Sequence, residues 1–181
     1  MIYVALLRGI NVGGKNKIDM KQLRITFEKA GMKSVTTYIN SGNIIFSDTT
    51  NTKDELEKLL EKIILENFDL EIKILLLTID EFSVIIKKLP DNWKNDKDMK
   101  SDVLFLWKDI NDPAILDEIK TKPEIDTTIY VPGAILWSVD KQYLTKSGLM
   151  KLPGTDLYKK MSIRNVNTVR KIFEIMKATK K

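Results

Sequence analysis

A β-hairpin is predicted by the stretch VTTYINSGNIIF at residues 35–46. Its two arms, residues 35–39 and 43–46, are rich in the β-branched and aromatic residues that favour strands. Between them, Asn40-Ser41-Gly42 supplies residue types that tolerate the positive φ of a tight turn. The two arms should therefore be antiparallel neighbours in one sheet.

Amphipathic helices are predicted on both sides of this hairpin. Before it, Asp19 is a candidate cap, apolar residues follow on one face, and Gly31 provides a stop. After it, Thr52 and Glu55 have the spacing of a capping box. The apolar positions of this second helix recur at helical spacing and predict core residues: Leu56, Leu59, Leu60, Ile63 and Ile64.

Two further apolar runs, residues 2–8 and residues 72–77, complete the first half as strands. The order of elements is then β-α-β-β-α-β, which is the pattern of ferredoxin-like folds. We therefore expect an α+β protein in which residues 1–77 form a ferredoxin-like subdomain, with the strands at 2–8 and 72–77 in the same sheet.

Residues 78–181 predict a second α+β subdomain with a C-terminal helix. Its expected elements are a helix that begins at the Thr78–Glu81 capping box, a polar loop at 91–101, a strand at 103–107, a helix at 113–121 and a hairpin at 127–139. This order repeats β-α-β-β. Pro132-Gly133 suits the two central positions of a type II turn in the hairpin.

The repeat then diverges, because residues 143–161 contain two glycines and a proline and have no sustained periodicity. A last helix is predicted from about Asn167. We therefore expect the second subdomain to be a degenerate ferredoxin-like unit, and the presence of a fourth strand stays open. The strands of both halves are apolar on both faces, so each sheet should be covered on both sides, by helices and by the other half or a homodimer partner.

Composition excludes several kinds of chemistry. The 181 residues include no cysteine and no histidine, which excludes thiolate nucleophiles, serine–histidine triads and zinc sites that need these ligands. No metal and no cofactor are expected. The apolar run at residues 1–7 is too short to span a membrane and lacks a basic leader, so a cytoplasmic protein without membrane contact is expected.

The net charge of +5 is unevenly distributed along the chain. Residues 1–33 have seven Lys and Arg against two acidic residues, and residues 141–181 have eleven against two. The stretch between them therefore has a net charge of −9. Two basic ends that met in space would attract phosphates or acidic surfaces, whereas two that did not meet would only neutralise the acidic middle.

The loop after the first strand is the candidate ligand site. Residues 9–16 have the pattern G-x-x-x-x-G-K-N, which lacks the Ser or Thr that a P-loop uses to hold magnesium. ATPase or GTPase chemistry is therefore not expected, but glycine N–H groups and a nearby helix N-terminus can still accept a phosphate. The candidate ligand-binding residues are Arg8, Asn11, Gly13, Gly14, Lys15, Lys17, Asn40, Ser41, Arg164 and Asn165.

A structural explanation exists for most of these candidates. The glycines permit a tight path from strand to helix, and Asn11 can hydrogen-bond local backbone. Asn40 and Ser41 suit the hairpin turn, and Asn165 suits a cap of the last helix. The cations of the loop are explained less well, because a connection between two elements needs no positive charge.

Three motifs link distant segments of the chain: ALLRGINVGG at residues 5–14, TYINSGN at 37–43 and RNVNTV at 164–169. In these motifs the chain resembles the bacterial family catalogued as domain of unknown function 1697. The resemblance implies two α+β subdomains of ferredoxin-like type and supplies no activity. Because it links the three segments, it suggests that Arg8, Lys15 and Arg164 surround one anion.

Three functions remain open at this point. The first is a non-enzymatic protein that binds a nucleotide or nucleic acid through the basic loop. The second is an enzyme on a small anionic substrate, with Tyr38 or Glu28 moving protons, and the third is an assembly protein whose covered sheet is a dimer interface. Tyr3 and Phe46 could face outward and stack on bases, but no RNA-binding signature accompanies them, so sequence-specific RNA recognition is not expected. Weak affinity for nucleic acid through the basic ends stays open.

Overall fold

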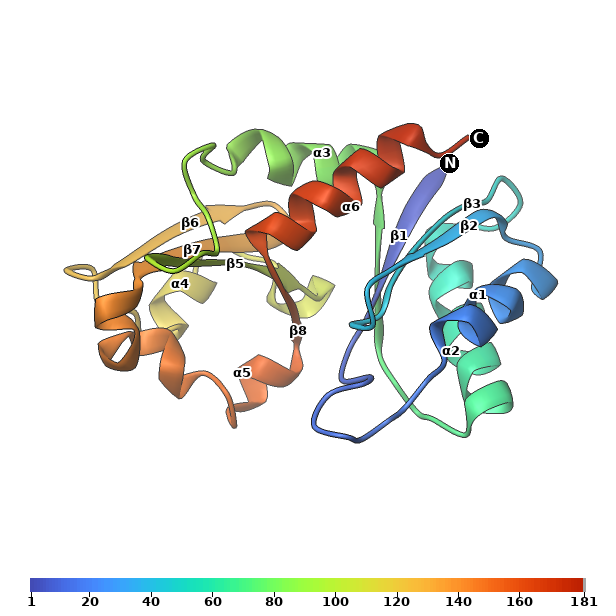
Figure 1. The fold of residues 1–181 in the computed structure, drawn as a ribbon, viewed down its shortest axis with the longest axis horizontal. Helices are drawn as coiled ribbons and strands as arrows, with labels where there is room; N and C mark the ends of the chain where they lie inside the picture. The colour runs from blue at the N-terminus through green and yellow to red at the C-terminus, as the bar shows by residue number, and fades with distance from the viewer. Residues whose placement is uncertain (181) are drawn as a thin grey trace. The chain divides into compact units, whose positions relative to one another are not determined.

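The computed structural model describes residues 1–180 and contains two four-stranded antiparallel sheets with helices, an α+β arrangement (Figure 1). The chain divides into two compact units. The first comprises residues 1–82 and the chain from Ile172 onward, and the second comprises residues 83–171. Each unit is described below by itself.

The first unit has the predicted β-α-β-β-α-β order. Its elements are β1 (Ile2–Leu7), α1 (Met20–Lys29), β2 (Lys33–Tyr38), β3 (Asn43–Ser47), α2 (Lys53–Phe68) and β4 (Ile74–Thr78). The strands lie in the order β2-β3-β1-β4, and every neighbouring pair is antiparallel. β1 pairs with β4 from Tyr3–Thr78 to Leu7–Ile74, which confirms that the first and last strands share one sheet.

Local hydrogen bonds start the helices where the sequence predicted. The Asp19 carboxylate accepts the Gln22 N–H at 2.7 Å at the start of α1. At the start of α2, Thr52 N–H donates to the Glu55 carboxylate at 2.8 Å, and Glu55 N–H donates to Thr52 Oγ1 at 3.4 Å. Both bonds of the capping box are therefore present, and they satisfy backbone donors that a helix leaves without intrahelical partners.

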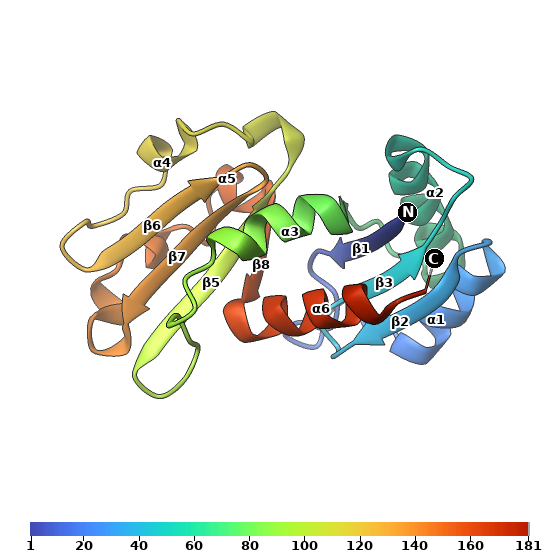
Figure 2. The same ribbon diagram turned by 90° about the horizontal axis from the view of Figure 1, so that it is seen from above.

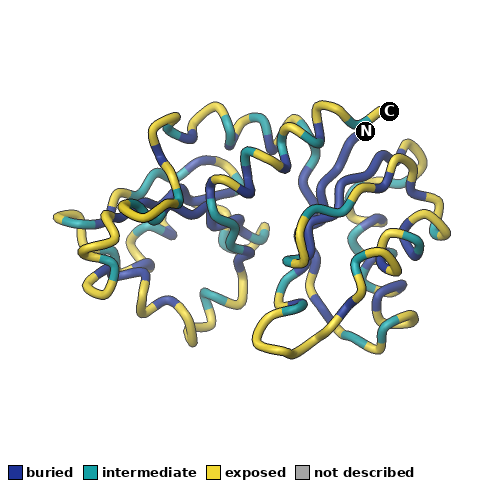
Figure 3. Tube along the Cα trace, viewed as in Figure 1, coloured by how far each residue is buried: buried dark blue, intermediate teal, exposed yellow. Residues whose placement is uncertain are grey.

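The core of the first unit lies between the sheet and helices α1 and α2. Leu60 is fully buried and Ile63 is 8% exposed, while Leu59 is partly buried against the same cluster. The predicted core is thus confirmed for Leu60 and Ile63, and Leu59 lies at its margin. Every residue of β1 and β3 is buried, which Figure 3 shows as dark blue segments, so both faces of the central strands are covered.

The second unit contains the fourth strand that the sequence left open. Its strands are β5 (Met99–Leu106), β6 (Asp126–Val131), β7 (Ala134–Asp140) and β8 (Met161–Asn165), in the antiparallel order β6-β7-β5-β8. The predicted β-α-β-β order of residues 100–140 is confirmed. The predicted polar loop at 91–101 was too long, because Met99 and Lys100 already pair with β7 and the Ser101 and Ser138 hydroxyls form a buried hydrogen bond of 2.8 Å.

The helices of the second unit are short. α4 (Ile115–Glu118) is one turn, and so is α5 (Asp156–Lys159); three 3-10 segments lie at Lys108–Ile110, Lys141–Lys146 and Gly148–Lys151. The predicted helix at 113–121 was therefore too long. The helix ends after Glu118 because Ile119 has extended backbone, with φ of −81° and ψ of 98°. Beyond it, Lys122 N–H donates to the Asp126 carboxylate at 2.8 Å.

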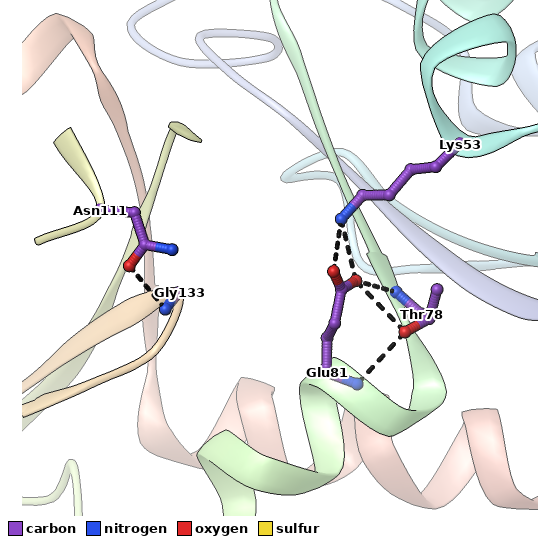
Figure 4. Close-up of polar contacts among 5 residues, drawn as sticks. All are labelled: Lys53, Thr78, Glu81, Asn111 and Gly133. Atoms are coloured by element: carbon purple, nitrogen blue, oxygen red, sulfur yellow. Dashed lines mark hydrogen bonds and ion pairs between the residues drawn. The ribbon is translucent and has the colours of Figure 1, made fainter. Parts of the chain in front are cut away.

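Two longer helices begin in one unit and end in the other: α3 (Ile79–Lys88) and α6 (Val166–Ala178). Within the first unit, Thr78 and Glu81 form the predicted capping box at the start of α3, and Lys53 Nζ contacts the Glu81 carboxylate oxygens at 2.7 and 2.9 Å (Figure 4). No helix within residues 1–180 combines the length and the apolar character needed to cross a bilayer.

Candidate functional site

The loop between β1 and α1 is a miniature hairpin. Lys15 N–H donates to the Val12 carbonyl at 3.1 Å, and Asn11 N–H donates to the Asn16 carbonyl at 3.1 Å. At the turn, Gly13 and Gly14 have φ of +58° and +76°. Consecutive positive φ angles are typical of a type I′ turn, which glycine adopts without steric cost. The glycines therefore have a structural role in shaping this tip.

Asparagine side chains hold the loop in place. Asn11 Nδ2 donates to the carbonyls of Ile18 and Asn40, both at 3.0 Å, and Asn11 Oδ1 accepts the Ile18 N–H at 2.9 Å. Asn16 Nδ2 donates to the Gly9 carbonyl at 2.9 Å. The structure thus brings the loop and the β2–β3 turn together, and both hydrogens of the Asn11 amide have backbone partners.

The turn residues of the second motif also bond to one another. Asn43 Nδ2 donates to the Tyr38 carbonyl at 3.1 Å and to Ser41 Oγ at 3.0 Å. These bonds agree with the hairpin explanation of this motif. Ile39, next to them, has a φ of +49° and is 49% exposed, although β-branched residues rarely adopt positive φ.

The basic side chains of the loop lie at its surface. Lys15 and Lys17 are exposed, as the yellow segment after β1 in Figure 3 shows, and neither forms an ion pair within residues 1–180. Arg8, at the end of β1, is half-buried. The N-terminus of α1 is already satisfied by the Asp19 carboxylate, whose negative charge would repel an anion there. Any anion would therefore rely on the side-chain cations and the Gly13-Gly14 tip.

Arg164 and Asn165 belong to β8 in the second unit. The Arg164 guanidinium donates to Ser162 Oγ at 3.1 Å and to the Ile163 carbonyl at 2.8 Å, and burial lowers the pKa of Arg164 to about 10. Asn165 Oδ1 accepts the Thr168 N–H at 2.9 Å, which is the predicted capping contact at the start of α6. The convergence of Arg164 with Arg8 and Lys15 around one anion stays a prediction.

The aromatic residues that could have stacked on bases do not face outward. Tyr3 is 6% exposed and Phe46 is fully buried, and their rings stack on each other at 5.6 Å between centroids. Burial is also the largest reason that the pKa of Tyr3 is raised, followed by the charges of Asp48 and Glu81. A stacking platform of the kind found in RNA-recognition modules is therefore excluded at these two residues.

The two acid–base candidates, Glu28 and Tyr38, lie on different elements, α1 and β2. Glu28 forms an i, i+4 ion pair with Arg24 at 3.8 Å on the surface of α1, and Tyr38 is half-buried at the end of β2. Residues 1–180 contain no group of three or more acidic side chains placed to hold a metal ion.

Sequence reasoning missed a groove along the outer edge of β2. Two hollows of about 390 and 380 Å³ meet at Val35 and Thr36. Their walls come from α1 and from the end of α6, which are about 150 positions apart in the chain, counted from Glu28 to Ile175. One local signal does mark β2 as an edge strand. Its sequence is more polar than those of β1 and β3, whose residues are buried on both faces of the sheet.

A comparison with family models agrees with the first two of the three motifs, at residues 5–14 and 37–43. A family model described as Protein of unknown function (DUF1697) matches residues 1–137. No curated protein matches the chain. A similar solved structure is that of the conserved bacterial protein SP0830 from Streptococcus pneumoniae, which is 30% identical with a TM-score of 0.83 and is aligned over 97% of this chain and 98% of that one. The chain therefore belongs to the family of proteins of unknown function designated DUF1697.

Proposed function

We propose that the protein is a non-enzymatic binder of a phosphate-bearing ligand, a nucleotide or nucleic acid, through the basic loop between β1 and α1. The observation that carries the proposal is that Lys15 and Lys17 are exposed and make no ion pair within residues 1–180, on a loop whose backbone is held by Asn11 and Asn16. A loop that is already ordered loses little conformational entropy on binding. Cations without acidic partners also raise the local concentration of anions.

The chemistry of the loop favours contacts to phosphate rather than to bases. Tyr3 and Phe46 are buried, so these rings offer no stacking surface. Lysine ammonium groups act as point charges on phosphate oxygens, and Gly13 and Gly14 place backbone N–H groups at an exposed tip. Binding should therefore depend weakly on base sequence and strongly on salt. Arg8 and Arg164 are proposed as further contacts to the same ligand.

We also propose a fold type for the two units. Each is a ferredoxin-like subdomain, and the second is a degenerate form of it. It is supported by the shared strand order, β2-β3-β1-β4 in the first sheet and β6-β7-β5-β8 in the second. In both sheets the first strand of the unit is central and pairs with the third and the fourth.

The other two functions have less support. An enzyme on a small anion would need an acid or base aimed at the substrate, but Glu28 is engaged with Arg24 on an exposed helix surface. A homodimer through a sheet face is not needed to bury β1 and β3, because the single chain already buries every residue of both.

Thermal unfolding with added inorganic phosphate, mononucleotides or short oligonucleotides tests the proposal. A ligand that binds only the folded state, present at about 100 times its Kd, stabilises it by about 2.7 kcal/mol. We expect the rise in Tm with at least one of these probes to fall in a Lys15→Ala/Lys17→Ala double variant. The matched control is Lys58→Ala/Lys62→Ala on α2, which should keep the rise.

The proposal is abandoned if no probe raises the Tm of the wild type, or if the loop and control variants respond alike. A slope of log K against log salt that is lower in the loop variant than in the control would further identify Lys15 and Lys17 as the phosphate contacts.

A further inference from the structure

β2 is an edge strand with an open side. It lies at the end of the sheet order and pairs only with β3, with an irregularity in register between Lys33 and Thr36. In an antiparallel pair, alternate residues direct their N–H and C=O groups toward the partner strand and away from it. Within residues 1–180 no other strand pairs with the outward groups of β2. The strand therefore offers both backbone donors and acceptors along one side.

The open side of β2 forms the floor of a groove. The two hollows share Val35 and Thr36, so they are continuous along the strand. One wall is α1, and the end of α6 contributes the other at one end of the groove. Figure 2 shows α1 and the end of α6 beside β2. The wall residues are Lys21, Arg24 and Glu28 from α1 and Ile175, Ala178, Thr179 and Lys180 from the α6 end and the residues after it.

The two walls differ in chemistry. On α1, Lys21 is exposed without an ion pair within residues 1–180, and Arg24 shares its charge with Glu28 at a loose 3.8 Å. Lys33 of β2 and Lys180 near the groove end add positive charge, against Glu28 as the one carboxylate of the lining. The α6 wall, in contrast, presents the apolar side chains of Ile175 and Ala178. The α1 wall therefore favours acidic groups, and the α6 wall offers an apolar surface beside Thr179 and Lys180.

We infer that the edge of β2 binds an extended acidic segment of a partner protein, which joins the sheet as a fifth strand. Main-chain hydrogen bonds to an exposed sheet edge supply affinity in this mode, and pockets for alternate side chains supply specificity. Successive side chains of a strand point to opposite faces. A segment that alternates acidic and apolar residues would place its carboxylates near Lys21 and Arg24 and its apolar side chains near Ile175 and Ala178.

The open edge disfavours two other occupants. A second copy of the chain, paired through its own β2, would bring Lys33 and the α1 cations of both copies together, and like charges across paired strands are destabilising. The phosphate backbone of a nucleic acid presents acceptors, whereas the outward C=O groups of β2 need donors that alternate with acceptors at the spacing of a strand. A polypeptide supplies both. The inference is independent of the basic loop, because the groove lining includes neither Lys15 nor Lys17.

Fluorescence anisotropy with a labelled hexapeptide of alternating aspartate and valine tests the inference on the full chain. Six residues match the length of β2. We expect saturable binding that weakens about tenfold in Lys21→Glu/Arg24→Glu, since reversal of rim charges opposes an acidic partner. The control Lys58→Glu/Lys62→Glu on α2, which makes the same change in net charge, should bind as the wild type does, and thermal unfolding should establish that both variants fold.

Two further measurements separate strand addition from simple charge attraction. The same peptide with alternate backbone nitrogens methylated keeps its charge but loses donors, and it should no longer bind. Amide hydrogen exchange at residues 34–37 should slow when the unmodified peptide is bound, as new strand pairing protects those groups. Equal binding of the methylated peptide, of a lysine–valine peptide, or by the charge-reversed variant would overturn the inference, as would self-association of the chain through this edge.

Discussion

The two units have the same order of strands under very different helical cover. In the first, α1 and α2 of 10 and 16 residues pack on the sheet, whereas α4 and α5 of the second have four residues each. Strand order is a property of backbone pairing, and helices contribute by burying the apolar face of the sheet. The comparison indicates that in the second unit a network of polar hydrogen bonds stabilises irregular backbone that long helices would otherwise replace.

Asp126 is the centre of that network in the second unit. Its buried carboxylate accepts hydrogen bonds from Trp137 Nε1 at 3.0 Å, Gly148 N–H at 2.9 Å, Lys122 N–H at 2.8 Å and Ser147 Oγ. Burial alone would raise the pKa of Asp126, but these donors together outweigh it and lower the pKa. The network ties the irregular segments on either side of the β6–β7 hairpin to the sheet.

Gly148 allows the chain to approach this network closely. A Cβ at this position would lie 1.8 Å from the Lys120 carbonyl oxygen, so any other residue would force the backbone to shift. The requirement here is space rather than positive φ. The glycine that made residues 143–161 look irregular in sequence is thus part of what fixes their path.

The largest expected effect is the loss of the Asp126 carboxylate. Asp126→Ala leaves the buried indole and backbone donors without partners, so we expect a loss of about 4 kcal/mol in the free energy of unfolding. Chemical denaturation measures the loss, and hydrogen exchange should locate it in residues 120–150. Asp140→Ala, which removes an exposed carboxylate of the same unit, is the control and should change stability far less. Similar losses of stability in Asp126→Ala and Asp140→Ala would show that the Asp126 network does not hold the irregular segments of the second unit.

In the first unit the corresponding test is a cavity in the helix–sheet core. Leu60 of α2 is fully buried, so Leu60→Ala should cost about 2 to 5 kcal/mol through lost burial and the cavity left behind. The control is Leu65→Ala on the exposed side of the same helix, which should stay within about 0.5 kcal/mol of the wild type. A small effect at Leu60 would mean that apolar helix packing is not what supports this sheet.

The pH dependence of stability sharpens the role of Asp126. Because its folded pKa is lowered, its stabilising contribution is present above the unfolded value of about 3.9 and is lost as the pH falls through the folded pKa. We therefore expect the wild type to lose more stability than Asp126→Asn when the pH is lowered through this range. Parallel stability–pH curves for the two proteins would show that the carboxylate is not stabilised by its hydrogen bonds.

The smallest expected effect concerns the Lys53–Glu81 ion pair of the first unit. Lys53 near the start of α2 contacts Glu81 near the start of α3 (Figure 4), and both side chains are partly exposed. Lys53→Met should therefore cost about 0.5 kcal/mol, and less at high salt. Lys62→Met, which loosens the exposed Lys62–Glu66 pair, should have a still smaller effect. If Lys53→Met lowered the free energy of unfolding by more than Leu60→Ala does, the ion pair would stabilise the fold more than the core packing of α2, contrary to this expectation.

Local patterns predicted the first unit better than the second. The Thr52–Glu55 capping box and the Asn40-Ser41-Gly42 turn involve residues only a few positions apart, so the sequence contains all their partners. β8 is different: its five residues become a strand through pairing with β5, about 60 positions earlier in the chain. No local periodicity marks such a strand, because its partner supplies the hydrogen bonds.

The candidate site follows the same division. Asn11 was predicted to bond local backbone, and its contacts with Ile18 agree, while its bond to the Asn40 carbonyl unites two motifs distant in sequence. Exposure of Lys15 and Lys17 could be expected from a polar loop. The groove along β2 could not, because its walls come from α1 and from the end of α6.

The sequence by itself determined the absence of thiol and imidazole chemistry, the types of most elements and the positions of the helix caps. These follow from residue identity, from the 3.6-residue and two-residue periods, and from hydrogen bonds within one turn. Only the tertiary structure decided that Tyr3 and Phe46 are buried, that the helix predicted at 113–121 is limited to Ile115–Glu118, and that the end of α6 packs in the first unit. Each of these depends on groups brought together from distant parts of the chain, and their burial and partners are set by the packed fold.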